Sequence, residues 1–141
     1  MVDIEGKLQS QVMRLAGASK SLEGTLTDFV LSHLRAKETH HPFVRVFMAQ
    51  LFVGGDAFSR RIVDLQAAVD PPLYTLFGRL RERGLIRSDI PLPELIQSFK
   101  VLQLGVTSLW AVEGPPWKQS RALARRQVRF FCEGIRGEKH A

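Results

Sequence analysis

The sequence predicts an all-α fold, a single domain of about six to seven helices. Apolar residues recur at intervals of three and four along most of the chain, which is the spacing of one helix face. No segment alternates apolar and polar residues over five positions between turn residues, so strands are not expected. With 141 residues and 45% hydrophobic content, the chain is long enough for one core and short for two.

Composition restricts the compartment in which the protein is expected. No apolar run approaches the roughly 18 residues of a membrane span, because the run over 43–53 is interrupted by Arg45 and Gln50. The segment 1–15 carries acids early and lacks the apolar block of a secretory signal. Cys132 is alone, so an intrachain disulfide is excluded. We therefore expect a cytoplasmic protein without a membrane partner.

The chain is basic, with 20 Lys and Arg against 14 Asp and Glu and a formal charge of +6. Such an excess favours acidic partners when the cations gather on one face. Here the arginines fall in several segments, beside apolar positions that need a solvated opposite face. We interpret them as solvated helix faces in preference to a nucleic-acid surface. They are Arg60, Arg61, Arg79, Arg81, Arg83, Arg87, Arg121, Arg125, Arg126 and Arg129.

Four helices are expected before the middle of the chain. The first covers 1–18, and the second begins after a Ser19 or Ser21 cap and continues to a polar break over 37–41. Pro42 suits the first turn of a third helix, whose wide apolar arc predicts burial on most sides. A fourth covers 56–69 and is followed by Asp70, Pro71 and Pro72. The two prolines either kink a longer helix or divide two, and the sequence leaves both open.

The segment 80–94 predicts the end of one helix and the start of the next. Gly84 suits the left-handed residue after a helix, and Leu80 and Leu85 are spaced to touch across that cap. Pro93 and Glu94 suit the first turn of the following helix. This junction therefore connects two packed helices.

Two long helices complete the predicted fold. Residues 92–113 carry a wide apolar face and a second, smaller face, so this helix needs two packing partners. Gly114 and the prolines that follow it end this helix, and a last helix follows over 117–135. Small residues at Gly105, Ser108 and Ala122 permit close approach of another helix.

Four segments in this order, from roughly Leu22 to Ile135, resemble the C-terminal regulatory domain of the TetR family of bacterial transcription repressors. They are LEGTLTDFVLSHL, HPFVRVFMAQLF, GLIRSDIPLPELIQSF and RRQVRFFCEGIRG, the last with a late glycine. The resemblance implies a first helix over 1–18, a sensing core over 19–90 and dimerisation helices over 91–136. The last two helices are expected to pair with their two-fold mates as a four-helix bundle.

The family's N-terminal helix-turn-helix domain, which reads DNA, is expected to be missing from this chain. The nearest candidate, residues 15–29, does not fit the motif, because Lys20 to Glu23 lengthen its spacing and Thr27 replaces the usual aromatic residue. The resemblance thus implies that DNA is contacted only through a domain upstream of this chain.

Residues that carry catalytic or metal chemistry are sparse. His33, His40 and His41 lack the spacing of a metal motif, and Cys132 lies in apolar company that favours a packing role. No phosphate loop, nucleophile elbow or paired carboxylate motif is present. We expect neither an enzyme nor a cofactor nor a metal site, although His33 is a candidate for facing a cavity.

An effector pocket is predicted where aromatic rings and a few polar groups fall on inward stripes of different helices, since crossing helices leave gaps between large rings. The ligand-binding residues predicted are Phe29, His33, Phe47, Gln50, Leu51, Tyr74, Phe77, Phe99, Gln103 and Trp110. The effector is expected to be an unidentified apolar or amphipathic small molecule. For a single aromatic residue, plain core packing remains the stronger interpretation.

A homodimer interface is predicted on the last two helices. Its residues are Val101, Gly105, Ser108, Val112, Ala122, Arg125, Val128 and Arg129. Arg121, Arg125 and Arg129 share one face of the last helix, which either borders the interface or is simply solvated. The sequence thus favours the ligand-sensing and dimerisation domain of a TetR-like regulator. The alternative is a helical interaction module with a solid core and no ligand.

Overall fold

A computed structural model describes residues 14, 21–37, 45–46, 55–114 and 116–137 of the chain. Within these residues it contains four helices and no strand. The helices are α2 (Leu22–Lys37), α4 (Asp56–Glu82), α5 (Leu92–Glu113) and α6 (Trp117–Ile135). The predicted all-α class is confirmed for the described part. The helices predicted over 1–18 and from Pro42 fall almost entirely outside it, so the total number of helices stays a prediction.

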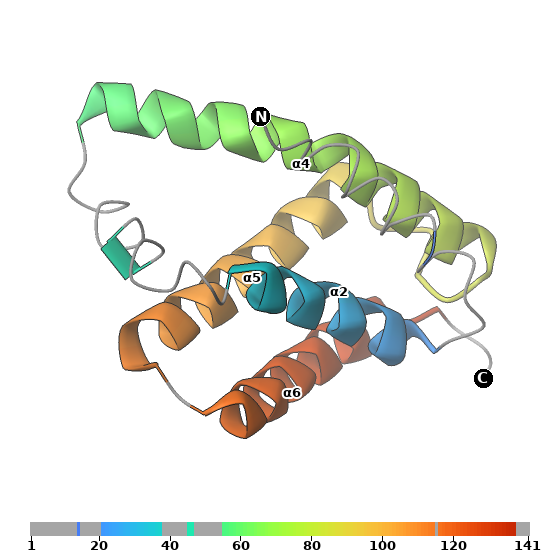
Figure 1. The fold of residues 1–141 in the computed structure, drawn as a ribbon. Helices are drawn as coiled ribbons and strands as arrows, with labels where there is room; N and C mark the ends of the chain where they lie inside the picture. Colours follow the sequence, from blue (N-terminus) through green and yellow to red (C-terminus); the bar gives the residue numbers. More distant parts are fainter. Residues whose placement is uncertain (1–13, 15–20, 38–44, 47–54, 115, 138–141) are drawn as a thin grey trace.

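The four helices pack around one core, in which α6 contacts both α2 and α5, and α4 contacts α5 (Figure 1). Helices α2 and α6 run antiparallel. At one end Arg136 binds Glu23 with 2.8 Å between Nη2 and Oε1, and at the other the Arg35 guanidinium lies 4.0 Å from the Trp117 ring centroid. The first half of α4 extends beyond the other three helices (Figure 1).

The core is formed by the apolar stripes that the spacing predicts. Helix α2 contributes its residues at three- and four-residue spacing, the second half of α4 contributes a leucine and phenylalanine stripe, and one face each of α5 and α6 closes the interior. The largest fully buried side chains are Phe29, Phe77, Phe99, Leu22, Leu26, Leu34, Leu73, Leu76, Leu80, Leu95 and Val30. Burial of these side chains is the main source of stability.

Helix α2 begins with a side-chain cap. The Gly24 N–H donates to Ser21 Oγ over 3.0 Å, which satisfies one of the four amides that lack a partner at a helix start. Of the two serines proposed from the sequence, the structure selects Ser21.

Helix α4 continues through Pro71 and Pro72, which settles the alternative that the sequence left open. Each proline removes a backbone donor from the helix, and the Thr75 hydroxyl donates to the Pro71 carbonyl one turn earlier over 3.2 Å. Packing of the stripe that follows, which includes Leu73, Leu76 and Phe77 at 0% exposure, outweighs the lost hydrogen bonds.

The junction after α4 is a Schellman cap. Gly84 has φ 75°, its N–H donates to the Arg81 carbonyl, and the Leu85 N–H donates to the Leu80 carbonyl over 3.1 Å. Leu80 is fully buried, and Leu85 packs against the core cluster to which Leu80 belongs. The left-handed glycine was predicted from the sequence, and the cap is confirmed.

The same junction is bridged to the residues after α6. The Arg87 N–H donates to the Ile135 carbonyl over 2.9 Å, and the Gly137 N–H donates to the Leu85 carbonyl over 3.0 Å. These bonds form an isolated antiparallel bridge between Ile86 and Arg136. The end of the last helix is thereby fixed to the loop between α4 and α5.

Replacing Gly84 with alanine is expected to lower the free energy of unfolding by about 1–2 kcal/mol, because a side chain disfavours positive φ. Nothing lies within 4 Å of a Cβ at this position, so steric contact adds nothing. Urea unfolding measures the change. Gly78→Ala is the matched control, since Gly78 lies inside α4 with equal space around it. The control should raise the free energy of unfolding by about 0.5–1 kcal/mol. If both substitutions changed the free energy of unfolding in the same direction, the role given to Gly84 would be contradicted.

Candidate functional site

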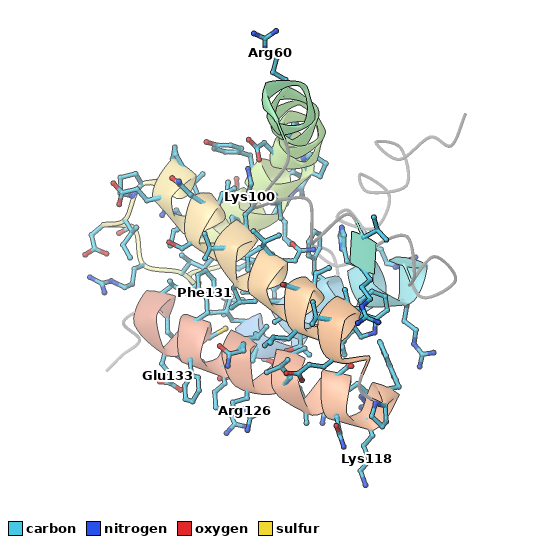
Figure 2. All side chains as sticks on the ribbon, turned by 90° about the vertical axis from the view of Figure 1, so that its left-hand side faces the viewer. Arg60, Lys100, Lys118, Arg126, Phe131 and Glu133 are labelled. Carbon is cyan, nitrogen blue, oxygen red and sulfur yellow. The ribbon has the colours of Figure 1, made fainter. Side chains whose placement is uncertain are left out.

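Each of the four helices contributes one phenylalanine to an aromatic cluster, made of Phe29, Phe77, Phe99 and Phe131. The Phe99 ring is central: its centroid lies 5.7 Å from that of Phe29, 5.3 Å from that of Phe77 and 5.7 Å from that of Phe131. These are favourable tilted and edge-on arrangements of aromatic rings. In Figure 2, Phe131 lies between α5 and α6. The aromatic cluster therefore joins all four helices.

His33 is the polar side chain at the edge of the aromatic cluster. Its ring centroid is 4.4 Å from that of Phe29, and its Nδ1 lies 3.0 Å from the Phe29 carbonyl oxygen. A carbonyl only accepts, so the hydrogen-bond pattern assigns the proton to Nδ1 and leaves Nε2 as an acceptor in the neutral ring. This intrahelical bond fixes the orientation of the imidazole against the rings.

The structure brings together four of the residues predicted for a pocket, namely Phe29, His33, Phe77 and Phe99. The others are dispersed or lie elsewhere. Trp110 is buried about three turns beyond Phe99 on α5, Gln103 is half-buried on the same helix, and Tyr74 is 40% exposed on α4. Phe47, Gln50 and Leu51 lie outside the described residues.

A groove of about 230 Å³ lies between the start of α2 and the side of α6, away from the aromatic cluster. It is lined by Ser21, Glu23, Gly24, Thr27, Asp28, Arg125 and Arg129. Its walls carry charges of both signs and no aromatic ring. The groove therefore differs in chemistry from the apolar pocket that the sequence predicts.

Helix α5 carries a second apolar surface, opposite the core. We call it the outer face, and it consists of Val101, Leu104, Gly105, Ser108 and Val112. Val101 is 65% exposed and Val112 is 54% exposed, whereas Phe99, Val106 and Trp110 point into the core. Contiguous apolar surface of this kind marks an interaction site more often than a solvated surface.

The outer face also explains why α5 is the helix among the described residues that is long and apolar enough to cross a membrane. Its most apolar window has a mean hydropathy of 1.2, and core helices of soluble proteins meet the same criterion. In α5 the apolar residues divide between a face that packs in the core and the outer face.

Helix α6 carries exposed apolar surface of its own at Phe130, which is 64% exposed, with half-buried Leu123 two turns earlier. Neither residue was predicted for an interface. The sequence feature that predicts an exposed ring is the pair Phe130 and Phe131. Neighbouring positions on a helix point about 100° apart, so both rings cannot lie on one core face. Helical spacing places Phe130 and Leu123 beyond Phe131 on the α5 side of the helix.

The remaining predicted interface residues of α6 lie elsewhere. Val128 is fully buried and belongs to the core of the chain, because it falls on one stripe with Ala124 and Cys132. Arg125 and Arg129 line the groove beside α2, and Ala122 is exposed near them in sequence. The apolar candidate surface on α6 is thus formed by Leu123 and Phe130.

Cys132 is fully buried in the core, as its apolar neighbours predict. Burial raises the pKa of the Cys132 thiol to about 12, and the nearby Glu23 carboxylate acts in the same direction. Across the described residues, no group of three or more His, Cys, Asp or Glu side chains is placed to hold a metal ion.

The Cys132 thiol is expected to react with Ellman's reagent only after denaturation, because the thiolate is the reacting form. A pKa raised on folding contributes stability that is complete below about pH 9 and is lost as the pH rises towards about 12. Urea unfolding of the wild type and Cys132→Ala across this range tests the effect. A cysteine that reacts rapidly in the folded protein at neutral pH would contradict it.

Comparison with protein-family models, with curated proteins and with solved structures found no match to this chain.

Proposed function

We propose that this chain is the ligand-sensing and dimerisation domain of a TetR-like transcriptional regulator. The all-α fold of the described residues and the cap at Gly84 support the proposal. The observation that carries the proposal is the exposed outer face of α5, together with Leu123 and Phe130 on α6. Dimerisation has the strongest support, since this surface lies on the two helices expected to form a bundle.

The outer face has the composition of a helix–helix contact. Gly105 and Ser108 lie between Val101 and Val112, so two short residues separate two branched apolar ones along one stripe. A second helix can approach closely over the short residues and pack against the branched ones. When the partner is an identical copy, a two-fold axis places the same stripe on both sides.

Ligand sensing would use the aromatic cluster and His33. An apolar molecule that enters between Phe29, Phe77 and Phe99 must separate rings from three helices, while His33 offers it one polar contact. Phe99 and Val101 are two residues apart on α5, so a shift of this helix moves the cluster and the outer face together. The ligand would thereby favour one dimer geometry and alter DNA binding by an upstream domain.

A helical interaction module with a solid core is the second candidate. The rings of Phe29, Phe77 and Phe99 are fully buried, and the groove between α2 and α6 lies apart from them. Close packing of this kind requires no ligand. This candidate differs from the first in its solid interior, and its partner is either a second copy of the chain or another protein.

Thermal-shift screening with small apolar compounds separates the two candidates. Sensing predicts saturable stabilisation that increases with ligand concentration, because the ligand binds only the folded state. His33→Gln should keep the fold and weaken the response to compounds with a hydrogen-bonding group, while purely apolar compounds are less affected. No response across a broad panel would favour the solid module.

A further inference from the structure

Five cations project from α6 into solvent, and we call them the basic stripe: Lys118, Arg121, Arg125, Arg126 and Arg129. The helix has one acid, Glu133, near its end. Figure 2 shows Lys118 and Arg126 extending from α6 away from the rest of the molecule. A large part of the +6 charge of the chain is thus gathered on one helix.

The basic stripe differs in its pairing from three other cations of the chain, Arg87, Lys100 and Arg136. Arg87 binds Asp89, Lys100 binds Asp70 and Arg136 binds Glu23, each with an N–O distance below 3 Å. Within the part of the chain that the structure describes, no ion pair or hydrogen bond involves a side chain of the basic stripe. These cations therefore contribute little to holding the fold together, and they create a positive potential along α6.

The dimensions of the basic stripe suit a row of phosphates. Lys118 and Arg129 are separated by a helical rise of about 16 Å, over which each strand of B-form DNA carries about five phosphates. Arg121, Arg125 and Arg129 follow one another at intervals of one turn. Glu23 and Asp28 lie across the groove on α2 and border one edge of the stripe, and Glu133 lies one turn beyond Arg129 on α6.

We propose that the basic stripe binds the phosphate backbone of double-stranded nucleic acid without reading its sequence. A site for single strands needs a row of exposed aromatic side chains among the cations. Beside the basic stripe, α6 carries one strongly exposed ring, Phe130, one turn from Arg126. A membrane-surface helix needs a free apolar side, whereas the apolar stripe of α6 that includes Val128 is buried in the core. The proposal does not depend on ligand sensing or dimerisation.

Fluorescence anisotropy of the full chain with a labelled duplex DNA of about 20 base pairs, between about 50 and 200 mM KCl, tests the proposal. We expect binding that weakens with salt and is independent of sequence. In the variant Arg121→Gln/Arg125→Gln/Arg129→Gln, the slope of log affinity against log salt concentration should become less steep by about 2.7, or about 0.9 for each lost phosphate contact.

The matched control is Arg45→Gln/Arg60→Gln/Arg79→Gln, which removes the same charge from exposed positions elsewhere. In Figure 2, Arg60 projects from α4 far from α6. The control should keep the wild-type slope, and circular dichroism should show that both variants are folded. Equal loss in both variants, no duplex binding at about 50 mM salt, or tighter binding to single strands would overturn the proposal. So would stripe-dependent binding to phosphatidylglycerol vesicles without binding to duplex DNA.

Discussion

Replacing Phe99 with alanine is expected to lower the free energy of unfolding by about 3–5 kcal/mol, the largest effect on stability predicted for a single residue of this chain. The Phe99 ring contacts those of Phe29, Phe77 and Phe131, and it is fully buried. Its removal leaves a cavity bordered by three helices, which cannot all collapse into it. Chemical unfolding followed by circular dichroism measures the change.

Two further substitutions make this test specific. Phe99→Leu retains much of the apolar volume and should cost less than the alanine variant. Phe130→Ala removes the same ring from a side chain that is 64% exposed, so in the dilute monomer it should change the free energy of unfolding by less than about 0.5 kcal/mol. A similar loss for Phe99→Ala and Phe130→Ala would show that the aromatic cluster is not the centre of the core.

The double variant Val101→Asp/Val112→Asp is expected to raise the dissociation constant of the proposed dimer by at least about a thousandfold, or about 4 kcal/mol. Both side chains are more than half exposed in the single chain, so the fold of the monomer should be preserved. In a two-fold interface each carboxylate occurs twice and would be buried without a cation opposite it. Sedimentation equilibrium measures the dissociation constant.

Tyr74→Asp is the control for this variant. Tyr74 is also an exposed large apolar residue, but it lies on α4 and outside the outer face. Replacing an exposed apolar side chain with a carboxylate at this position should leave the dissociation constant within about threefold of the wild-type value, or about 0.6 kcal/mol. If the control dissociates the dimer as fully as the double variant, the effect reflects surface charge and not the outer face.

The elements whose signals are local could be predicted from the sequence. The Gly84 cap depends on one left-handed residue and a leucine contact five residues apart, and both follow from the order of neighbouring residues. Likewise, Gly114 marks the end of α5 and Pro116 marks the start of α6, and the apolar spacing of nearby residues indicates both helices. The path of α4 through Pro71 and Pro72 is different, because tertiary packing decides whether a helix survives two missing donors.

The candidate sites could be predicted only in part, because they depend on which helices meet. Phe29, Phe77 and Phe99 fall on inward stripes and were predicted to lie inside, but the fourth ring of the cluster, Phe131, was not singled out. The prediction that Val128 lies at the dimer interface is also wrong, because Val128 is fully buried in the core, whereas its neighbour Phe130 is exposed. Likewise, the bridge from Gly137 to Leu85 joins distant segments and has no local signal.

The molar mass of the unmodified chain in solution tests the central claim most directly, since the outer face is proposed to join two copies. Light scattering at tens of micromolar should give twice the 15.9 kDa mass of one chain, because an apolar stripe on two neighbouring helices favours association at such concentrations. A mass of 15.9 kDa under these conditions would contradict the claim and leave the outer face without its proposed partner.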